Sequence, residues 1–251
     1  MKEPLPDQMT AKDFEKAAAE YLAYIKRRHP EHFWKSVAQS KQRHITDTSL
    51  DILASERSDV HVYGELLIQW RNAKGEMRRV VPDNMVVLAE RRPDASTNFA
   101  IEVQKPRPFF VLEYVSEDNK RKHYQKSYEK YETELKVPYY SILHLDEQKL
   151  LLLEYDERQG GYRSVHPDRN GRHAIRELEL ELGLLDGWAR FWWKGALLPT
   201  STELQAEVVE ALEQLEATKR KRTDIDRLIA DKDRQLAEMQ AERERLRKSA
   251  G

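Results

Sequence analysis

Two short apolar runs in the middle of the chain each contain one acidic residue. Residues 80–88 and 109–115 are rich in valine, leucine and aromatic residues, a pattern typical of buried strands. Asp83 interrupts the first run and Glu113 the second. A buried strand rarely carries a carboxylate unless the charge is paired or bound to a metal. The pattern therefore indicates neighbouring strands that bring Asp83 and Glu113 together as a metal site.

Further strand-like runs lie on both sides of this pair. Residues 60–70, which include Glu65, are followed by a turn and then by residues 77–81, which predicts a hairpin. Residues 175–185 alternate leucine with acidic residues, which is the two-residue period of a strand. The other extended segments are predicted at 99–103, 139–145, 149–155 and 162–165.

Helical spacing of apolar residues predicts two helices in the same part of the chain. The first spans 10–28, with Thr10 as its cap and Asp13 at the third position. The second spans 120–136, and one of its faces is a lysine stripe made of Lys122, Lys126 and Lys130. Residues 31–47 show neither period and are predicted to be irregular. Strands that precede and follow the second helix indicate a mixed α/β domain.

Residues 188–193 contain four aromatic side chains. Such a run suits either a platform on which nucleic-acid bases stack or a hydrophobic cap that closes the domain. Few basic residues are interleaved with the aromatic ones, so the cap is the favoured interpretation.

The chain changes character at residues 201–248, which contain neither proline nor glycine. Apolar residues recur there at alternating spacings of four and three, which predicts a coiled coil. Three polar residues, Thr218, Arg222 and Lys232, lie in this seam and weaken a simple homodimer. The tail is therefore expected to form a homodimer, to bind a partner helix, or to fold back on the domain.

Composition narrows the class of protein. A chain of 251 residues can hold one substantial core with an appendage, and its 35% of charged residues indicates that part of it is solvated helix. The net charge of −1 argues against tight non-specific binding to nucleic acid, although it allows a local basic patch. The absence of cysteine excludes disulfides and thiolate metal sites. Residues 1–10 lack the pattern of a signal peptide, and no apolar run spans a bilayer, so a cytoplasmic protein is expected.

The acids and lysines fit the hydrolysis of a phosphodiester bond. One or two carboxylates hold Mg²⁺ together with a substrate phosphate, and the metal neutralises charge and activates water. A nearby lysine can orient or deprotonate that water. Asp83, Glu113 and a lysine of the second helix would supply this set, with Glu65 as a candidate third acid.

The order of these residues resembles a known family. Pro82-Asp83, then residues 111–116 around Glu113, then a helix with Tyr131 followed by residues 137–140 is similar to the Uma-two family. Its members are identified as bacterial endonucleases of the PD-(D/E)XK superfamily, and the resemblance covers residues 63–193. It implies a restriction-endonuclease-like mixed sheet flanked by helices, cleavage of DNA, and Asp83 and Glu113 as ligands of Mg²⁺ or Mn²⁺.

The chain departs from the superfamily pattern at the lysine. The pattern places a lysine two residues after the glutamate, where this chain has Val115. In the Uma-two family the lysine comes from the next helix, and an alignment without gaps from Glu113 ends beside Lys126. Lys122 matches an earlier basic position of the same segment. Lys122 and Lys126 are therefore ranked ahead of Lys130 as catalytic residues.

Two alternatives remain beside this interpretation. Asp83 after a proline can be a turn residue, and Glu113 can form a structural ion pair with a lysine. The functional hypotheses are a Mg²⁺-dependent endonuclease that acts on DNA and a non-catalytic protein with the same fold that assembles through its tail. The expected divisions are an N-terminal helical segment packed on the core (1–50), a nuclease-like α/β domain (51–199) and a coiled-coil tail (200–251).

Overall fold

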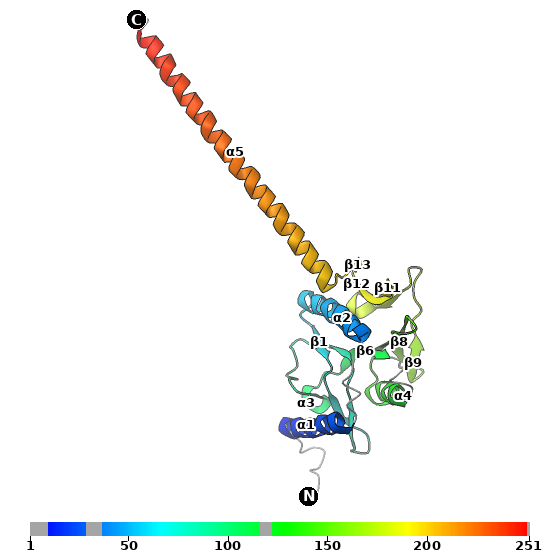
Figure 1. Cartoon of the computed structure of the whole chain (residues 1–251). Coiled ribbons are helices and arrows are strands. Elements are labelled where there is room, and N and C mark those ends of the chain that lie inside the picture. The colour runs from blue at the N-terminus through cyan, green and yellow to red at the C-terminus, as the bar shows by residue number, and fades with distance from the viewer. Residues whose placement is uncertain (1–9, 29–36, 116–121, 250–251) are drawn as a thin grey trace. The chain divides into compact units, whose positions relative to one another are not determined.

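A mixed sheet of six strands carries both candidate acids or their immediate neighbours (Figure 1). The computed structural model describes residues 10–28, 37–115 and 122–249, with the backbone alone for residues 122–124 and 249. In order across the sheet, the strands are β1 (Val60–Gly64), β4 (Asn84–Leu88), β6 (Pro108–Val115), β7 (Tyr139–His144), β8 (Lys149–Asp156) and β9 (Gly161–Ser164). Strands β6 and β7 are parallel, and the other neighbours are antiparallel.

Two smaller sheets complete the strand content of the described residues. One has the order β3-β2-β5, from β2 (Ile68–Arg71), β3 (Met77–Val80) and β5 (Phe99–Ala100). The other has the order β10-β11-β12-β13, from β10 (Arg172–Ile175), β11 (Leu180–Leu185), β12 (Trp188–Trp193) and β13 (Ala196–Leu197).

The helices of the described residues come from five parts of the chain. Near the N-terminus are α1 (Ala11–Arg28) and α2 (Val37–Glu56), and a short α3 (Ile101–Gln104) follows β5. Between β6 and β7, α4 (Lys122–Glu129) continues into the π-helical segment η4 (Lys130–Leu135), and η5 (Arg176–Leu178) is a 3₁₀ turn. The C-terminal helix is α5 (Ser201–Ser249). The predicted fold class, mixed sheets flanked by helices with a long C-terminal helix, is confirmed.

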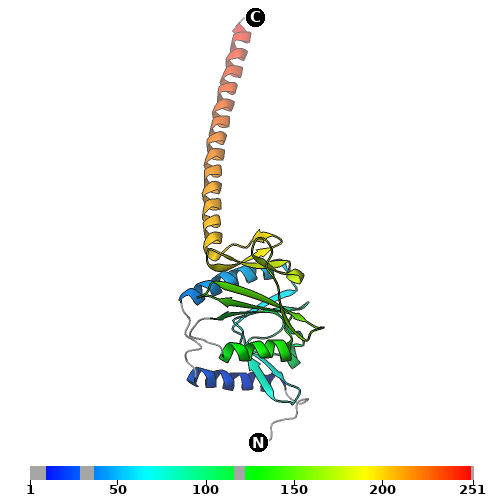
Figure 2. The same ribbon diagram turned by 90° about the vertical axis from the view of Figure 1, so that its right-hand side faces the viewer.

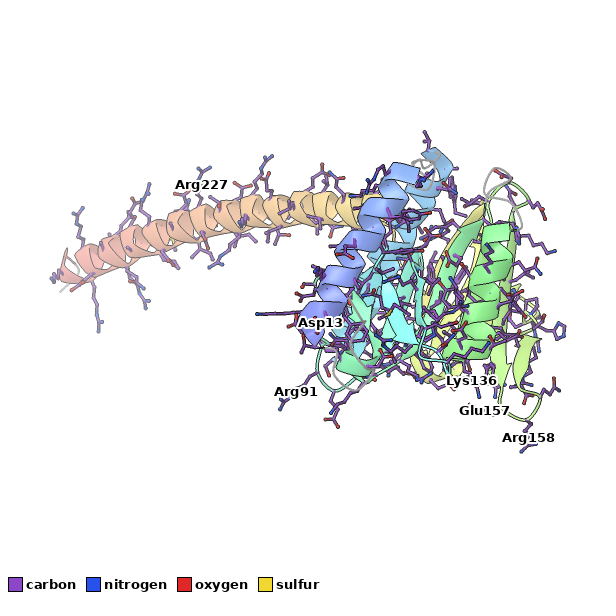
Figure 3. The ribbon with its side chains drawn as sticks, turned by 90° about the horizontal axis from the view of Figure 1, so that it is seen from below. Asp13, Arg91, Lys136, Glu157, Arg158 and Arg227 are labelled. Atoms are coloured by element: carbon purple, nitrogen blue, oxygen red, sulfur yellow. The ribbon has the colours of Figure 1, made fainter. Side chains whose placement is uncertain are left out.

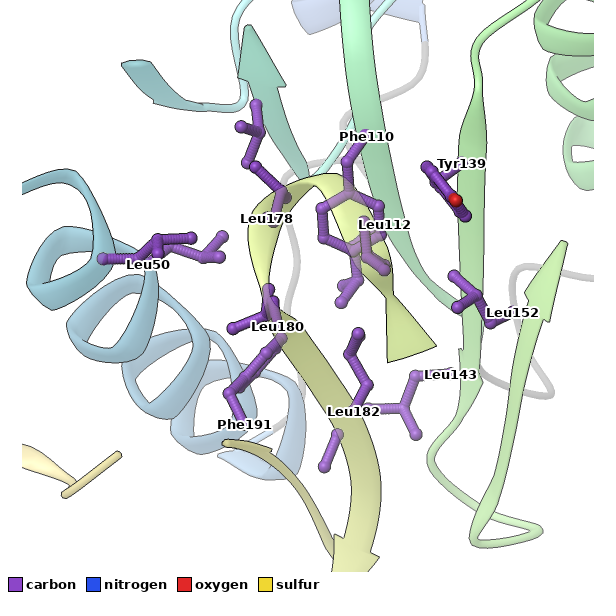
Figure 4. Packing of buried hydrophobic residues seen from close by; sticks show 14 of the residues in the cluster. Leu50, Phe110, Leu112, Tyr139, Leu143, Leu152, Leu178, Leu180, Leu182 and Phe191 are labelled. Atoms are coloured by element: carbon purple, nitrogen blue, oxygen red, sulfur yellow. The ribbon is translucent and has the colours of Figure 1, made fainter. Parts of the chain in front are cut away.

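Both faces of the six-stranded sheet are covered by apolar contacts. On one face, Phe110 and Leu112 of β6 pack with Leu50 of α2 and with residues of the β10–β12 sheet (Figure 4). On the other face, Val111 of β6 packs with Tyr131 of η4 and with residues of the β3-β2-β5 sheet. Figure 2 shows α2 and α4 on opposite sides of the sheet. Buried residues of β6 therefore lie on both sides of Glu113, which is itself only partly buried.

Residues 31–47 are predicted to be irregular. This prediction is wrong from residue 37 onward, because α2 begins there. The face that α2 buries is largely polar, and its residues include Gln39, Gln42, Thr46 and Ser49. Gln42 donates from Nε2 to the carbonyl of Ala189 at 3.0 Å and accepts the Ala189 N–H at 2.9 Å. A helix that buries polar side chains has no apolar period, so its sequence lacks the usual helical pattern.

Four predicted strands are also interrupted. Residues 60–70 divide into β1 and β2, and residues 80–88 divide into the end of β3 and β4, with the two parts of each in different sheets. Residues 175–185 form the end of β10, the turn η5 and then β11, with Glu179 at a φ of 52° between them. The extended segment predicted at 99–103 changes into α3 after Ala100. The helix predicted at 10–28 is confirmed as α1, and Thr10 donates to the Asp13 carboxylate from its N–H and its hydroxyl, both at 2.8 Å.

The aromatic run of β12 lies largely in the core. Phe191 is fully buried and Trp192 is 7% exposed, in agreement with the favoured hydrophobic cap. Charged side chains extend from the surface elsewhere, among them Asp13, Arg91, Lys136, Glu157 and Arg158 (Figure 3). No helix in the described ranges is long and apolar enough to cross a membrane.

The chain divides into two compact units after Thr200. The second unit consists of α5, a helix of 49 residues. Pairing of α5 into a coiled coil stays a prediction, as does the division of the chain into three parts.

The sheet core predicts a large difference between two leucines. Leu112 is fully buried, so Leu112→Ala should lower the free energy of unfolding of the N-terminal unit by about 2–5 kcal/mol. Leu184 is 38% exposed, and Leu184→Ala should change the free energy of unfolding much less. Urea titration followed by tryptophan fluorescence measures both, and equal losses would contradict the described core.

Candidate active site

Asp83 and Glu113 are brought together by the pairing of two strands. Strand β4 starts at Asn84, directly after Asp83, and pairs with β6 so that Asn84 lies opposite Leu112. Asp83 therefore comes next to Glu113, the residue that follows Leu112. The backbone N–H of Tyr114 donates to Oδ2 of Asp83 at 2.8 Å, which ties the carboxylate to β6.

Glu113 is partly buried, and its carboxyl group receives a hydrogen bond from a tyrosine. Tyr131, which is fully buried, donates from its hydroxyl to Oε1 of Glu113 at 2.8 Å. Burial raises the pKa of Glu113 well above its usual 4.5, and the charge of Asp83 raises it further, although the hydrogen bond from Tyr131 opposes both. Glu113 thus keeps its proton over a wider pH range than an exposed glutamate.

Tyr131 belongs to a π-helical segment. Segment η4 starts at Lys130 and ends at Leu135, and Lys136 after it has a φ of 49°. π-Helical insertions are rare and are found often at functional sites, because the extra residue redirects a side chain. Here both Tyr131 and Leu135 are buried, and Tyr131 reaches the acid on β6.

Arg43 of α2 joins Asp83 to the third candidate acid. Its Nη2 forms an ion pair with Oδ1 of Asp83, and its Nη1 lies 3.3 Å from Oε2 of Glu65. The side chain of Arg43 is 14% exposed, and its guanidinium carbon lies 5.7 Å from the centre of the Tyr114 ring. The Nε of Arg43 is buried and has no hydrogen-bond partner in the part of the chain that the structure describes.

One turn along α2, Asp47 contacts the residue after Asp83. Asn84 donates from Nδ2 to Oδ1 of Asp47 at 2.7 Å, and its own Oδ1 accepts the Tyr114 hydroxyl at 2.8 Å. The spacing of four residues between Arg43 and Asp47 thus matches the consecutive pair Asp83 and Asn84. Helix α2, the start of β4 and the end of β6 are joined by one polar network.

Glu65 has an unusual backbone conformation. Its φ is 51°, in the left-handed region that residues other than glycine seldom adopt. Its N–H donates to the carbonyl of Asp83 at 3.0 Å, and its side chain is 51% exposed. Residues held in this region often lie at functional sites, where the surrounding structure maintains the strain. Glu65 is therefore the solvent-facing acid of this group.

The lysines ranked from the sequence lie differently from the acids. Lys126 is exposed on α4, and none of the described contacts joins it to Asp83 or Glu113. The side chain of Lys122 lies outside the described residues. Lys130 donates from Nζ to the carbonyl of Arg79 at 2.7 Å, and burial, then the charge of Arg78, lower its pKa.

Sequence analysis missed Arg43 and assigned no role to Tyr131. Arg43 lies in the segment expected to be irregular, and no local pattern predicts an ion pair between residues 40 positions apart. Tyr131 was visible as a member of the helical tyrosine series, but its direction depends on the π-helical segment.

The donor set of the two central acids fits a divalent cation. Carboxylate oxygens suit Mg²⁺ and Mn²⁺, and Mg²⁺ commonly takes one or two protein carboxylates and completes its shell with water and substrate phosphate. No group of three or more histidine, aspartate or glutamate residues suited to a metal occurs among the described residues. Asp83 and Glu113 would therefore hold a metal as a pair, and a cation would relieve the repulsion that raises the pKa of Glu113.

Comparison with known proteins gives a distant likeness among solved structures. No protein-family model and no curated protein matches the chain. Among solved structures, the chain is similar to that of "a putative nuclease belonging to DUF820" from Anabaena variabilis. The TM-score is 0.45 at 13% identity, with 57% of this chain and 75% of that chain covered. This likeness assigns neither an activity nor a residue role to the present chain.

The raised pKa of Glu113 predicts a pH-dependent loss of stability in metal-free protein. Because the pKa in the folded state exceeds the usual 4.5, the folded state binds the extra proton, and the resulting stability is present below pH 4.5 and lost as pH rises through the raised pKa. Glu113→Gln mimics the protonated acid and should not lose this stability. The free energies of unfolding of the two proteins should then differ by about 1.4 kcal/mol for each pH unit by which the pKa of Glu113 is raised.

Thermal melting of both proteins in EDTA over a pH series measures the difference. Glu157→Gln, which changes an exposed glutamate in the turn between β8 and β9, is the control and should follow the wild type. Parallel curves for wild type and Glu113→Gln would contradict the raised pKa.

Proposed function

We propose that this chain is a metal-dependent endonuclease that hydrolyses phosphodiester bonds in DNA, with Asp83 and Glu113 as the ligands of Mg²⁺ or Mn²⁺. The observation that carries this proposal is the contact between two carboxyl groups where β4 and β6 pair, one of them partly buried and with a raised pKa. Perturbed acids that share a site are characteristic of catalytic and metal centres.

Each acid has a separate support. Asp83 accepts the N–H of Tyr114 on one oxygen and the guanidinium of Arg43 on the other. Glu113 accepts the hydroxyl of Tyr131. A carboxylate has about four lone-pair positions, so these contacts orient both acids and leave capacity for a ligand. Orientation of ligands by such neighbours is typical of metal sites.

A bound Mg²⁺ supplies charge neutralisation on the phosphate and a lower pKa for water. Asp83 and Glu113 would hold this cation, and its charge would favour the ionised form of Glu113 against the burial and the repulsion by Asp83 that raise the pKa. In this proposal Lys122 or Lys126 assists the water, and Glu65 is an additional acid at the solvent side.

Local positive charge supports a polyanionic substrate despite the net charge of −1. Burial lowers the pKa of Lys130 most, and the charges of Arg78 and Lys126 lower it further, so both cations lie near Lys130. Arg78 is itself paired with Glu134. Lys130 directly precedes Tyr131, the residue bonded to Glu113. A local group of cations suits contact with the phosphates of a nucleic acid, although none of the described contacts joins these cations to Asp83 or Glu113.

Cleavage assays test this proposal. Asp83→Asn and Glu113→Gln should each reduce cleavage of plasmid DNA in Mg²⁺ or Mn²⁺ by more than about a hundredfold, beyond the loss expected for a residue that only orients a ligand. Lys126→Ala should reduce the rate of cleavage at least about a hundredfold if Lys126 is the assisting lysine. Asp59→Asn, which removes a surface partner of Arg57, is the control and should retain full activity. Cleavage by both acid variants at the wild-type rate would exclude this function.

Helix α5 favours a second candidate function, an interaction protein that assembles through its tail. Ten large apolar residues of α5 are 49–64% exposed, namely Val208, Val209, Leu212, Leu215, Ile225, Leu228, Ile229, Leu236, Met239 and Leu246. Apolar side chains at a heptad spacing usually become buried against another helix. In this function the α/β unit would be a non-catalytic scaffold.

The seam of α5 predicts an effect on association. If the tail forms a homodimer, Ile225→Asn combined with Ile229→Asn should convert a dimer into a monomer, because both residues lie in the apolar seam. Arg227→Asn combined with Asp231→Asn alters exposed positions outside the seam and should leave the dimer intact (Arg227 is labelled in Figure 3). Sedimentation of the full chain at micromolar concentration distinguishes them. A monomeric wild type would rule out the homodimer and leave a partner helix.

A further inference from the structure

Arg43 is the cation that the structure places against the acids of the site. It contacts Asp83 with Nη2 and Glu65 with Nη1, and its side chain is only 14% exposed. We propose that Arg43 is a positioning residue that holds Asp83 in place and, through its fixed charge, limits how tightly the site binds a metal ion. The metal-binding part of this inference is independent of cleavage, and the part about rate rests on the proposed function.

The first argument is that Arg43 is held rigidly. Helix α2 is anchored by Gln42, which exchanges two hydrogen bonds with the backbone of Ala189. The guanidinium then lies over the ring of Tyr114, whose own N–H donates to Asp83. Arginine is charged at every pH at which the protein is folded, so this positive charge is permanent.

The second argument comes from the two oxygens of Asp83. Arg43 engages Oδ1 and the N–H of Tyr114 engages Oδ2, so rotation of the carboxylate would break one contact or the other. The contact with Tyr114 is a backbone contact that any residue at position 114 would make. Arg43 is the side chain on which the orientation of Asp83 depends.

The third argument is electrostatic. Arg43 offsets part of the negative charge of Asp83 and Glu65, both of which it contacts. A divalent cation bound by Asp83 and Glu113 would therefore meet a positive charge already in contact with one of its ligands. Charges only a few ångströms apart in a partly enclosed site interact strongly. Removal of that charge should tighten metal binding at the same time as it releases Asp83.

The fourth argument is that the contacts made at position 43 suit an arginine better than a lysine. The planar fork of a guanidinium can bond two carboxylates at once with fixed geometry, whereas a lysine offers a single flexible point of charge. Arg43 uses this property, because its two terminal nitrogens serve two different acids.

The experiment uses the full chain with Arg43→Met, which removes the charge, and Arg43→Lys, which keeps it. Arg57→Met is the matched control, since Arg57 is 21% exposed and pairs with Asp59. Mn²⁺ binding is measured by calorimetry, and cleavage of DNA gives kcat and KM. Thermal melting verifies that each variant is folded, and Arg43→Gln replaces Arg43→Met if the latter does not fold.

The proposal predicts opposite changes in affinity and rate. Arg43→Met should bind Mn²⁺ roughly three- to tenfold more tightly, because a repelling charge is gone. Its kcat should fall roughly ten- to a hundredfold with little change in KM, because Asp83 is no longer oriented. Arg43→Lys should keep the wild-type affinity for Mn²⁺ and regain part of the rate. Arg57→Met should change neither quantity.

Weaker or unchanged Mn²⁺ binding in folded Arg43→Met would overturn the proposal, because it would leave Arg43 a purely structural role. So would the absence of Mn²⁺ binding in both the wild type and Arg43→Met. If the wild type cleaves no DNA while Arg43→Met still binds Mn²⁺ more tightly, and Asp83→Asn abolishes that binding, the endonuclease proposal fails and the role of Arg43 stands.

Discussion

Repulsion between two partly buried carboxyl groups is the constraint on which the site depends. Asp83 and Glu113 are adjacent because β4 and β6 pair, and burial with mutual repulsion raises the pKa of Glu113. Each nearby polar contact reduces this cost in its own way. Tyr131 donates a hydrogen bond, the N–H of Tyr114 donates another, and Arg43 supplies a full charge. The remaining imbalance is what a divalent cation would relieve.

The sheet makes this arrangement rigid. Apolar contacts cover both faces of the six-stranded sheet, and β6 contributes residues to each face. An acid on such a strand cannot turn toward water without disturbing packed neighbours. The polar network from Asp47 through Asn84 to the Tyr114 hydroxyl then sets the position of α2 against the strand ends. Sites carried by packed strands and helices hold their geometry better than sites carried by loops.

The C-terminal unit has the opposite character. The residues of α5 are exposed along nearly its whole length, and its apolar side chains form a seam instead of a core. A single helix of 49 residues gains little stability from its own backbone, so a seam of this kind is normally stabilised by another helix. The two units therefore combine an enclosed polar site with a surface suited to association.

Local patterns in the sequence were sufficient for the strand around Glu113 and for the long C-terminal helix, whereas the run around Asp83 is divided between two sheets. An apolar run of a few residues or a repeated heptad is a property of neighbouring positions, and it survives whatever the rest of the chain does. Which side chains surround the acids was decided only in the tertiary structure. Helix α2 buries polar residues and so lacks an apolar period, and Arg43 meets Asp83 across 40 positions. Contacts of that range leave no periodic trace, because the strands and helices that carry them must first pack together.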